Sequence, residues 1–258
     1  MTQNHDRTED LVRYACQDGL ALITLARPDR ANAVDLPTAR ALGAAVDRAA
    51  NDPAVRAVLI RGEGRRFCAG GDVAAMAVAA DRSGYLEELA DTLDQALQRL
   101  AALPTPVVAA VQGSVAGAGL ALMLSCDVIV SAASTKFLMA YAGVGLTPDC
   151  GTSYLLPRAI GQVRALELAL TGRTLTAAEA HQWGLVTEVV DDEMLQERAL
   201  EFGQRLASGP AFALGQAKRL LRAWHMPREQ MGREEARVIG EAVVREEAVA
   251  LLASFTGR

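Results

Sequence analysis

A single carboxylate, Asp149, lies at a point in the sequence where it could transfer a proton. It follows Pro148 in the stretch LTPDCGTSYLLPR (146–158), shortly before an apolar run. Its side chain could cap a helix that is expected to begin near Gly151, because aspartate is a favoured cap residue. It could instead be the acid–base group of an active site. Both roles could coexist.

Two segments of small residues could stabilise negative charge in such a site. They are RRFCAGGD (65–72) and VQGSVAGAGLAL (111–122), and each follows an expected buried strand and opens an expected helix. Small side chains let a ligand approach backbone N–H groups, and the N-terminus of a helix favours negative charge. The first segment could also be only a tight turn with Asp72 as the helix cap. The second matches neither the dinucleotide motif GxGxxG nor the P-loop. Together they could aim two backbone N–H groups at one oxygen, which is an oxyanion hole.

Hydrophobic periodicity predicts the elements that would position these segments. Short apolar runs that end in turn residues predict strands. They lie at 19–28, 54–64, 104–113 and 127–132. Apolar residues at helical spacing predict helices between them, at 36–51 and 84–102. This alternation indicates an α/β fold with a largely parallel sheet. Helical periodicity dominates from about Thr152 onward, which predicts a core over 1–195 and a helical region over 196–258.

The composition argues against several classes of function. The net charge is −5, which argues against a nucleic-acid partner. Four cysteines without CxxC spacing and three scattered histidines predict reduced, buried thiols and no metal site. The polar N-terminus does not resemble a signal or transit peptide, and no apolar run is as long as a membrane span. We therefore expect a cytoplasmic protein that does not bind a membrane.

Several motifs resemble those of the crotonase superfamily, the enoyl-CoA hydratase/isomerase family. The resemblance begins with FCAGGD, followed by PTPVVAAVQGSVAGAGLALMLSCDVIVSA. It continues through other segments in the order of the family, from about residue 19 to residue 225. These segments are LARPDRANAVD, GLTPDCGTSYLLPRAIG, LALTGRTLTAAEAHQWGLVTEVV and GPAFALGQAK.

The resemblance implies a fold, an assembly and a substrate class. The fold is a crotonase-like spiral of ββα turns, followed by a C-terminal helical region that mediates formation of a homotrimer or a dimer of trimers. The substrate is an acyl-CoA thioester of fatty acid metabolism, so coenzyme A is part of the substrate and no separate cofactor is expected. The implied oxyanion donors are the N–H groups of Ala69 and Ala118. The residues expected to contact the substrate are Gly70, Gly71, Asp72, Gly117, Tyr141 and Arg27.

The chain departs from the hydratases of this family at both water-activating glutamates. The matching positions hold Ala121 and Tyr141. Alanine cannot transfer a proton, and a phenol with a pKa near 10 is a poor base at neutral pH. Tyr141 is expected either to line the acyl pocket or to donate a hydrogen bond. Asp149 lies in a PD-x-GT segment that resembles acyl-CoA isomerases of the phenylacetate-pathway type, which pair this aspartate with an apolar residue.

The sequence therefore predicts an acyl-CoA isomerase that shifts a double bond through a dienolate, with Asp149 as a two-way acid–base group. Hydration, the lyase activity named for much of the family, is one alternative. A second is an aroyl-CoA dehalogenase-like hydrolase, because DCGTSYLLPR resembles the segment with its nucleophilic aspartate. Those enzymes use a histidine base, however, and this chain has no histidine between residues 5 and 181. A third alternative is a catalytically silent homologue that binds coenzyme A.

Overall fold

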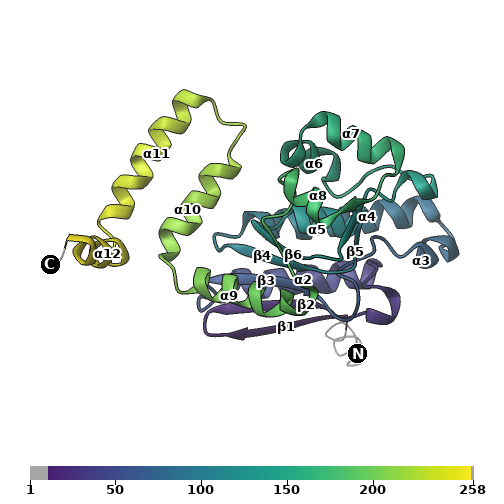
Figure 1. Ribbon diagram of the computed structural model, residues 1–258, viewed down its shortest axis with the longest axis horizontal. Helices are drawn as coiled ribbons and strands as arrows, with labels where there is room; N and C mark the ends of the chain where they lie inside the picture. Colours follow the sequence, from purple (N-terminus) through teal and green to yellow (C-terminus); the bar gives the residue numbers. More distant parts are fainter. Residues whose placement is uncertain (1–10, 257–258) are drawn as a thin grey trace.

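The computed structural model describes residues 11–256 of the chain, which form a parallel sheet covered by helices on both faces (Figure 1). The larger sheet has the strand order β1-β2-β3-β4-β6-β9. Its strands are β1 (Val12–Gln17), β2 (Leu20–Leu25), β3 (Ala57–Gly62), β4 (Val107–Val111), β6 (Val128–Ala132) and β9 (Glu188–Val190). The pairing of β1 with β2 is antiparallel and the others are parallel. The strand β1 lies at the edge of the sheet and is largely exposed, so its short pattern of apolar residues did not predict a strand.

A smaller sheet lies beside the larger one. It contains β5 (Ser114–Ala116), β7 (Lys136–Leu138) and β8 (Leu175–Thr176). Cys68, which follows β3, joins it through a parallel bridge to Val115 of β5. After each of β3, β4 and β6, the chain thus leaves the larger sheet and pairs in the smaller one. This repeat confirms the predicted ββα spiral.

Two apolar clusters hold the layers together. Residues of the central strands alternate between them, because successive side chains of a strand point to opposite faces. Val58 and Ile60 of β3 belong to the cluster beneath α2 (Leu36–Asn51) and α4 (Arg82–Ala102). Leu59 of β3 belongs to the cluster beneath α9 (Leu195–Ala207). Both faces of the sheet are therefore buried, which agrees with the continuous apolar runs in the sequence.

The C-terminal helices extend away from the sheets (Figure 1). They are α10 (Ala211–Arg222), α11 (Arg228–Val243) and α12 (Glu246–Thr256), and their presence agrees with the predicted helical region. Because α9 packs on the sheet, the first helix after residue 195 belongs to the layered body. The division at residue 195 stays a prediction.

A buried ion cluster attaches α10 to the core. Lys218 Nζ lies 2.8 Å from Asp127 Oδ2, and Arg222 contacts Asp127 Oδ1 at 2.7 Å. Lys218 also donates to the carbonyl of Thr105 at 3.0 Å. Burial lowers the pKa of Lys218, and the charge of Asp127 opposes that shift. Lys218 thus joins α10 to the loop before β4 and to the loop before β6.

Within residues 11–256, no helix is both long enough and apolar enough to span a membrane. The same residues contain no group of three or more His, Cys, Asp or Glu side chains arranged to hold a metal ion. The expectation that the N-terminus is not a targeting peptide rests in part on residues 1–10, which lie outside the described residues.

We expect Asp127→Asn to lower the free energy of unfolding by about 3 kcal/mol, because it leaves two buried cations without their counter-charge. Urea denaturation followed by circular dichroism measures the change. The control is Glu63→Gln, which breaks the exposed pair with Arg13 and should cost less than about 1 kcal/mol. Equal losses in the two variants would contradict the anchoring role of Asp127.

Candidate active site

A cavity of about 270 Å³ contains Asp149 together with both loops of small residues. Its walls come from α3 (Val73–Val78), α4, the start of α5 (Ala118–Leu124) and the segment 140–149. The lining residues are Ala69, Gly70, Gly71, Val73, Met76, Leu86, Glu87, Ala90, Gly117, Ala118, Ala140, Tyr141, Val144, Leu146, Thr147 and Asp149. The structure therefore brings together most of the residues that the sequence selected.

The side chain of Asp149 does not cap a helix. The helix α6 (Thr152–Ile160) begins after Gly151, and no side chain accepts a hydrogen bond at its N-terminus. The carboxylate instead accepts a hydrogen bond from the hydroxyl of Tyr141, with 2.7 Å between Tyr141 Oη and Asp149 Oδ1. The cap interpretation is therefore wrong, and Asp149 is partly buried in the cavity wall.

The backbone after Asp149 is strained. Cys150 has φ 49° and Gly151 has φ 74°, so two successive residues adopt the left-handed conformation. This conformation suits Gly151 but costs energy for Cys150, which carries a Cβ. The thiol of Cys150 is 6% exposed, and its Sγ lies 3.8 Å from the carbonyl oxygen of Ala90 on α4. These two left-handed residues turn the chain, so that Asp149 lines the cavity and α6 begins at Thr152.

The electrostatics of the site keep Tyr141 protonated. Burial of the phenol raises its pKa above the usual 10, and the negative charge of Asp149 raises it further. A neutral phenol can donate a proton in a hydrogen bond, so the contact to Asp149 persists across the physiological pH range. The hydroxyl of Thr152 lies 3.3 Å from the same Tyr141 oxygen. Of the two roles considered for Tyr141, the structure therefore shows both.

The assignment of Ala69 as an oxyanion donor needs correction. Its N–H group donates to the carbonyl of Ala31 at 3.1 Å. Gly71 is the alternative, because its N–H group has no acceptor among the described residues and Gly71 lines the cavity. Its neighbours Gly70 and Asp72 pair with Val34, so in an extended segment the N–H of Gly71 points to the other side.

The N–H group of Ala118, the second expected donor, is available to bind a ligand oxygen. Ala118 is the first residue of α5, where N–H groups have no acceptor within the helix. No described residue accepts a hydrogen bond from its N–H, and Ala118 lines the cavity. The two loops are in contact, because a Cβ added to Gly70 would lie 3.7 Å from Gly117 Cα. The unpaired N–H groups of Gly71 and Ala118 thus come from adjoining loops of one cavity.

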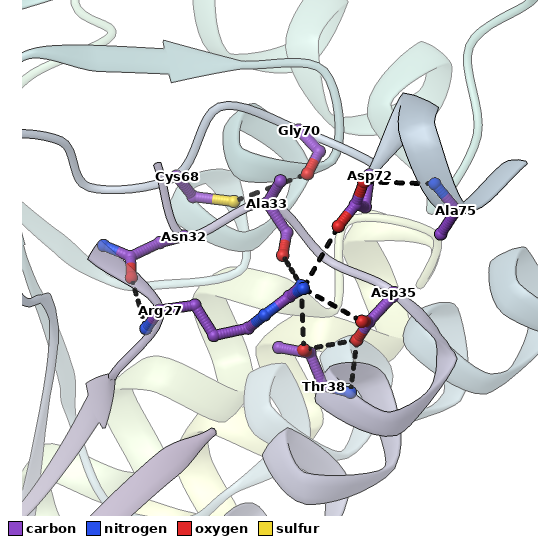
Figure 2. A network of polar contacts seen from close by, with 9 residues as sticks. All are labelled: Arg27, Asn32, Ala33, Asp35, Thr38, Cys68, Gly70, Asp72 and Ala75. Carbon is purple, nitrogen blue, oxygen red and sulfur yellow. Dashed lines mark hydrogen bonds and ion pairs between the residues drawn. The ribbon is translucent and has the colours of Figure 1, made fainter. Parts of the chain in front are cut away.

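Arg27 and Asp72 lie outside the cavity and support one of the loops that form its wall. The guanidinium of Arg27 lies 3.1 Å from carboxylate oxygens of both Asp35 and Asp72, and its side chain is 14% exposed (Figure 2). Asp72 also caps α3 by accepting from the N–H of Ala75 at 3.2 Å. Neither Arg27 nor Asp72 lines the cavity. In the structure these two residues belong to a buried network that braces the loop carrying Gly71, and their contacts with the substrate stay a prediction.

Sequence reasoning missed one wall of the cavity. The helix predicted over 84–102 was not assigned to a binding site from the sequence. Leu86, Glu87 and Ala90 of α4 all line the cavity, although Glu87 is also exposed. Because α3 and the segment 140–149 lie across from this part of α4, helical periodicity alone could not identify it.

Comparisons with known proteins agree with this geometry. The family model described as enoyl-CoA hydratase/isomerase matches residues 15–250. A 1,2-epoxyphenylacetyl-CoA isomerase of Escherichia coli is 40% identical over 209 residues, which cover 80% of this chain and 79% of that protein. A 4-chlorobenzoyl coenzyme A dehalogenase of Arthrobacter is 34% identical, covering 78% and 74% of the two chains. The crystal structure of an enoyl-CoA hydratase from Polaromonas superposes with a TM-score of 0.90 at 30% identity, covering 95% and 96%.

We expect Cys150 to be chemically inert despite its place beside Asp149. Burial raises the pKa of Cys150 above the usual thiol value, as it raises the pKa of Cys68 to about 11 and of Cys126 to about 12. A raised pKa leaves little thiolate below that pH, and the thiolate is the reactive form. Iodoacetamide at about pH 8 should therefore modify only the exposed Cys16. Peptide mass spectrometry, with unfolded protein as the control, would contradict this if Cys150 reacted as fast as Cys16.

Proposed function

This chain belongs to the enoyl-CoA hydratase/isomerase family, and we propose that it is an acyl-CoA isomerase that moves a double bond along the acyl chain of a thioester. The observation that carries the proposal is that the carboxylate of Asp149 shares a cavity with two backbone N–H groups that have no acceptor among the described residues. The relative from Escherichia coli, itself described as an acyl-CoA isomerase, supports it. The reaction needs no separate cofactor, because coenzyme A is part of the substrate.

The reaction follows from the placement of these groups. Asp149 removes a proton from the carbon next to the thioester of a 3-enoyl group. The electrons of that C–H bond form a dienolate, whose oxygen accepts hydrogen bonds from the N–H groups of Gly71 and Ala118. Asp149 then returns the same proton to the fourth carbon, which leaves the double bond between the second and third carbons. Atoms and charge balance without any added water.

Tyr141 positions the carboxylate in this scheme. Its hydroxyl binds Asp149 Oδ1 at 2.7 Å, which leaves Oδ2 to receive the substrate proton. A hydrogen bond from one side also limits rotation of the carboxylate, so Oδ2 keeps its direction as the proton moves from the second to the fourth carbon. Preorganisation of this kind lowers the barrier because the geometry is set before the reaction begins.

Hydration fits the cavity less well. The position of one water-activating glutamate is Ala121, which is fully buried in the core and does not line the cavity. The position of the other is Tyr141, whose raised pKa makes it a poor base. The dehalogenase-like alternative needs a histidine base, and no histidine lines the cavity in the described part of the chain.

We also propose that the protein assembles as a homotrimer or dimer of trimers through its C-terminal helices. These helices expose large apolar side chains that a monomer would leave in water. They include Leu221, Ile239 and Phe255, which are 79%, 71% and 94% exposed. Burial of such side chains against other copies would stabilise the extended arrangement of α10 to α12.

We expect Asp149→Asn to lower the rate of double-bond shift in a 3-enoyl-CoA by roughly 10²- to 10⁴-fold, because the amide cannot carry the proton. Absorbance of the conjugated thioester and deuterium uptake at the acyl carbons measure the two half-reactions. The control is Asp91→Asn on the exposed side of α4, which should retain activity. Full activity of Asp149→Asn would exclude Asp149 as the base. If neither the wild type nor any variant reacts, the silent-homologue alternative is favoured.

We expect Tyr141→Phe to lower kcat about 10- to 100-fold, the effect of losing one hydrogen bond to a charged group. KM should change little, because the hydrogen bond orients the carboxylate and does not hold the thioester. Steady-state kinetics separates the two constants. Tyr154→Phe is the matched control, since Tyr154 lies on α6 outside the cavity. An unchanged kcat in Tyr141→Phe would show that Asp149 needs no such positioning.

A further inference from the structure

The cavity has a second carboxylate, Glu87, which the proposed isomerisation does not use. It lies on α4 beside Leu86, and both line the cavity. Its only hydrogen bond among the described residues is accepted from the hydroxyl of Ser83, at 3.3 Å from Oε1, and no described cation forms an ion pair with it. The next residue, Glu88, is different: it pairs with Arg40 at 2.5 Å and does not line the cavity.

The surroundings of Glu87 are apolar. Apart from Tyr141, Thr147 and Asp149, every other side chain that lines the cavity is aliphatic, a methionine or absent. Those nearest to it along the chain are Leu86 and Ala90 of the same helix, and α3, which packs on α4, contributes Val73 and Met76. In the empty cavity, water can solvate the Glu87 carboxylate, because the residue is exposed.

An acyl group that fills the cavity would change the solvation of the Glu87 carboxylate. A hydrocarbon chain laid against Glu87 removes water from a charged group and returns no hydrogen bond, which is unfavourable. A chain that carries a hydroxyl at the same place replaces the lost water with a donor. Hydrogen bonds to an ionised acceptor are stronger than those between neutral groups. The Glu87 side chain thus disfavours a plain hydrocarbon chain and favours an acyl group that carries a hydroxyl at this place.

We propose that Glu87 selects acyl-CoA thioesters whose acyl group carries a hydroxyl remote from the thioester. The inference rests on the proposed function, because it assumes that the cavity holds the acyl group of a thioester. Glu87 is a specificity residue in this proposal and does not exchange a proton with the substrate. The hydroxyl of Ser83 already shows that the carboxylate accepts this kind of donor. A terminal carboxylate on the acyl group is disfavoured by its like charge.

The test measures binding without catalysis. Saturated acyl-CoA thioesters of increasing length, each with a terminal methyl or a terminal hydroxyl, are titrated calorimetrically into the wild type, Glu87→Leu and Glu88→Gln. Saturated chains cannot isomerise, so a failure of the isomerase proposal in the Asp149→Asn experiment leaves this measurement valid.

At chain lengths that reach Glu87, the wild type should bind the hydroxylated thioester about tenfold more tightly than its methyl counterpart. Glu87→Leu should reverse the preference, and Glu88→Gln should keep it. Circular dichroism confirms that each variant is folded. The same preference in Glu87→Leu as in the wild type, or no preference at any length, would overturn the proposal. Absence of binding by every thioester would overturn it together with the assignment of the cavity to an acyl group.

Discussion

The parallel pairing of Cys68 with Val115 is the interaction on which the site depends. Cys68 donates its N–H to the carbonyl of Ser114 at 3.3 Å, and its own carbonyl accepts from Ala116 at 3.1 Å. These two hydrogen bonds align the loop after β3 with the loop after β4. The loops then diverge into α3 and α5, so the N–H groups of Gly71 and Ala118 are left without partners beside one cavity. Backbone pairing, rather than any side chain, therefore positions the two N–H groups that the proposed reaction uses to stabilise a negatively charged oxygen.

A buried ion network supports this pairing from the other side. Arg27 follows β2 and contacts Asp35, the cap of α2, and Asp72, the cap of α3 (Figure 2). Breaking a buried pair leaves an uncompensated charge, so the three side chains hold their arrangement together. The loop that carries Gly71 is thus fixed both by the smaller sheet and by the start of two helices. This rigidity matters because a backbone donor stabilises a developing charge only if it is in place beforehand.

Much of this arrangement was predictable from the sequence, and the errors have a common cause. The central strands, α2, α4 and the place of Asp149 follow from periodicity, turn residues and the resemblance. The helix predicted to open at Gly113 was wrong in its first residues, because 114–116 form β5 by pairing with β7. The resemblance gave Ala69 as a donor, but its N–H pairs with the carbonyl of Ala31, an acceptor that is far away in the sequence. Each error concerns a partner that only the folded chain brings near, so a local pattern could not contain it.

Three separate sets of groups form the cavity, which is consistent with the different reactions for which related proteins of this fold are named. The proposed oxyanion donors are backbone groups, so changes of side chain would leave them in place as long as the two loops remain paired. In the proposed reaction the chemistry depends on a few side chains around these donors, namely Asp149, Tyr141 and the buried Ala121. A third set of residues, on α3, α4 and 140–149, lines the rest of the cavity and includes Glu87, and in the proposed function it would contact the acyl group. Because these sets lie on different elements, each can change without disturbing the others, and shared fold alone decides neither the reaction nor the acyl group.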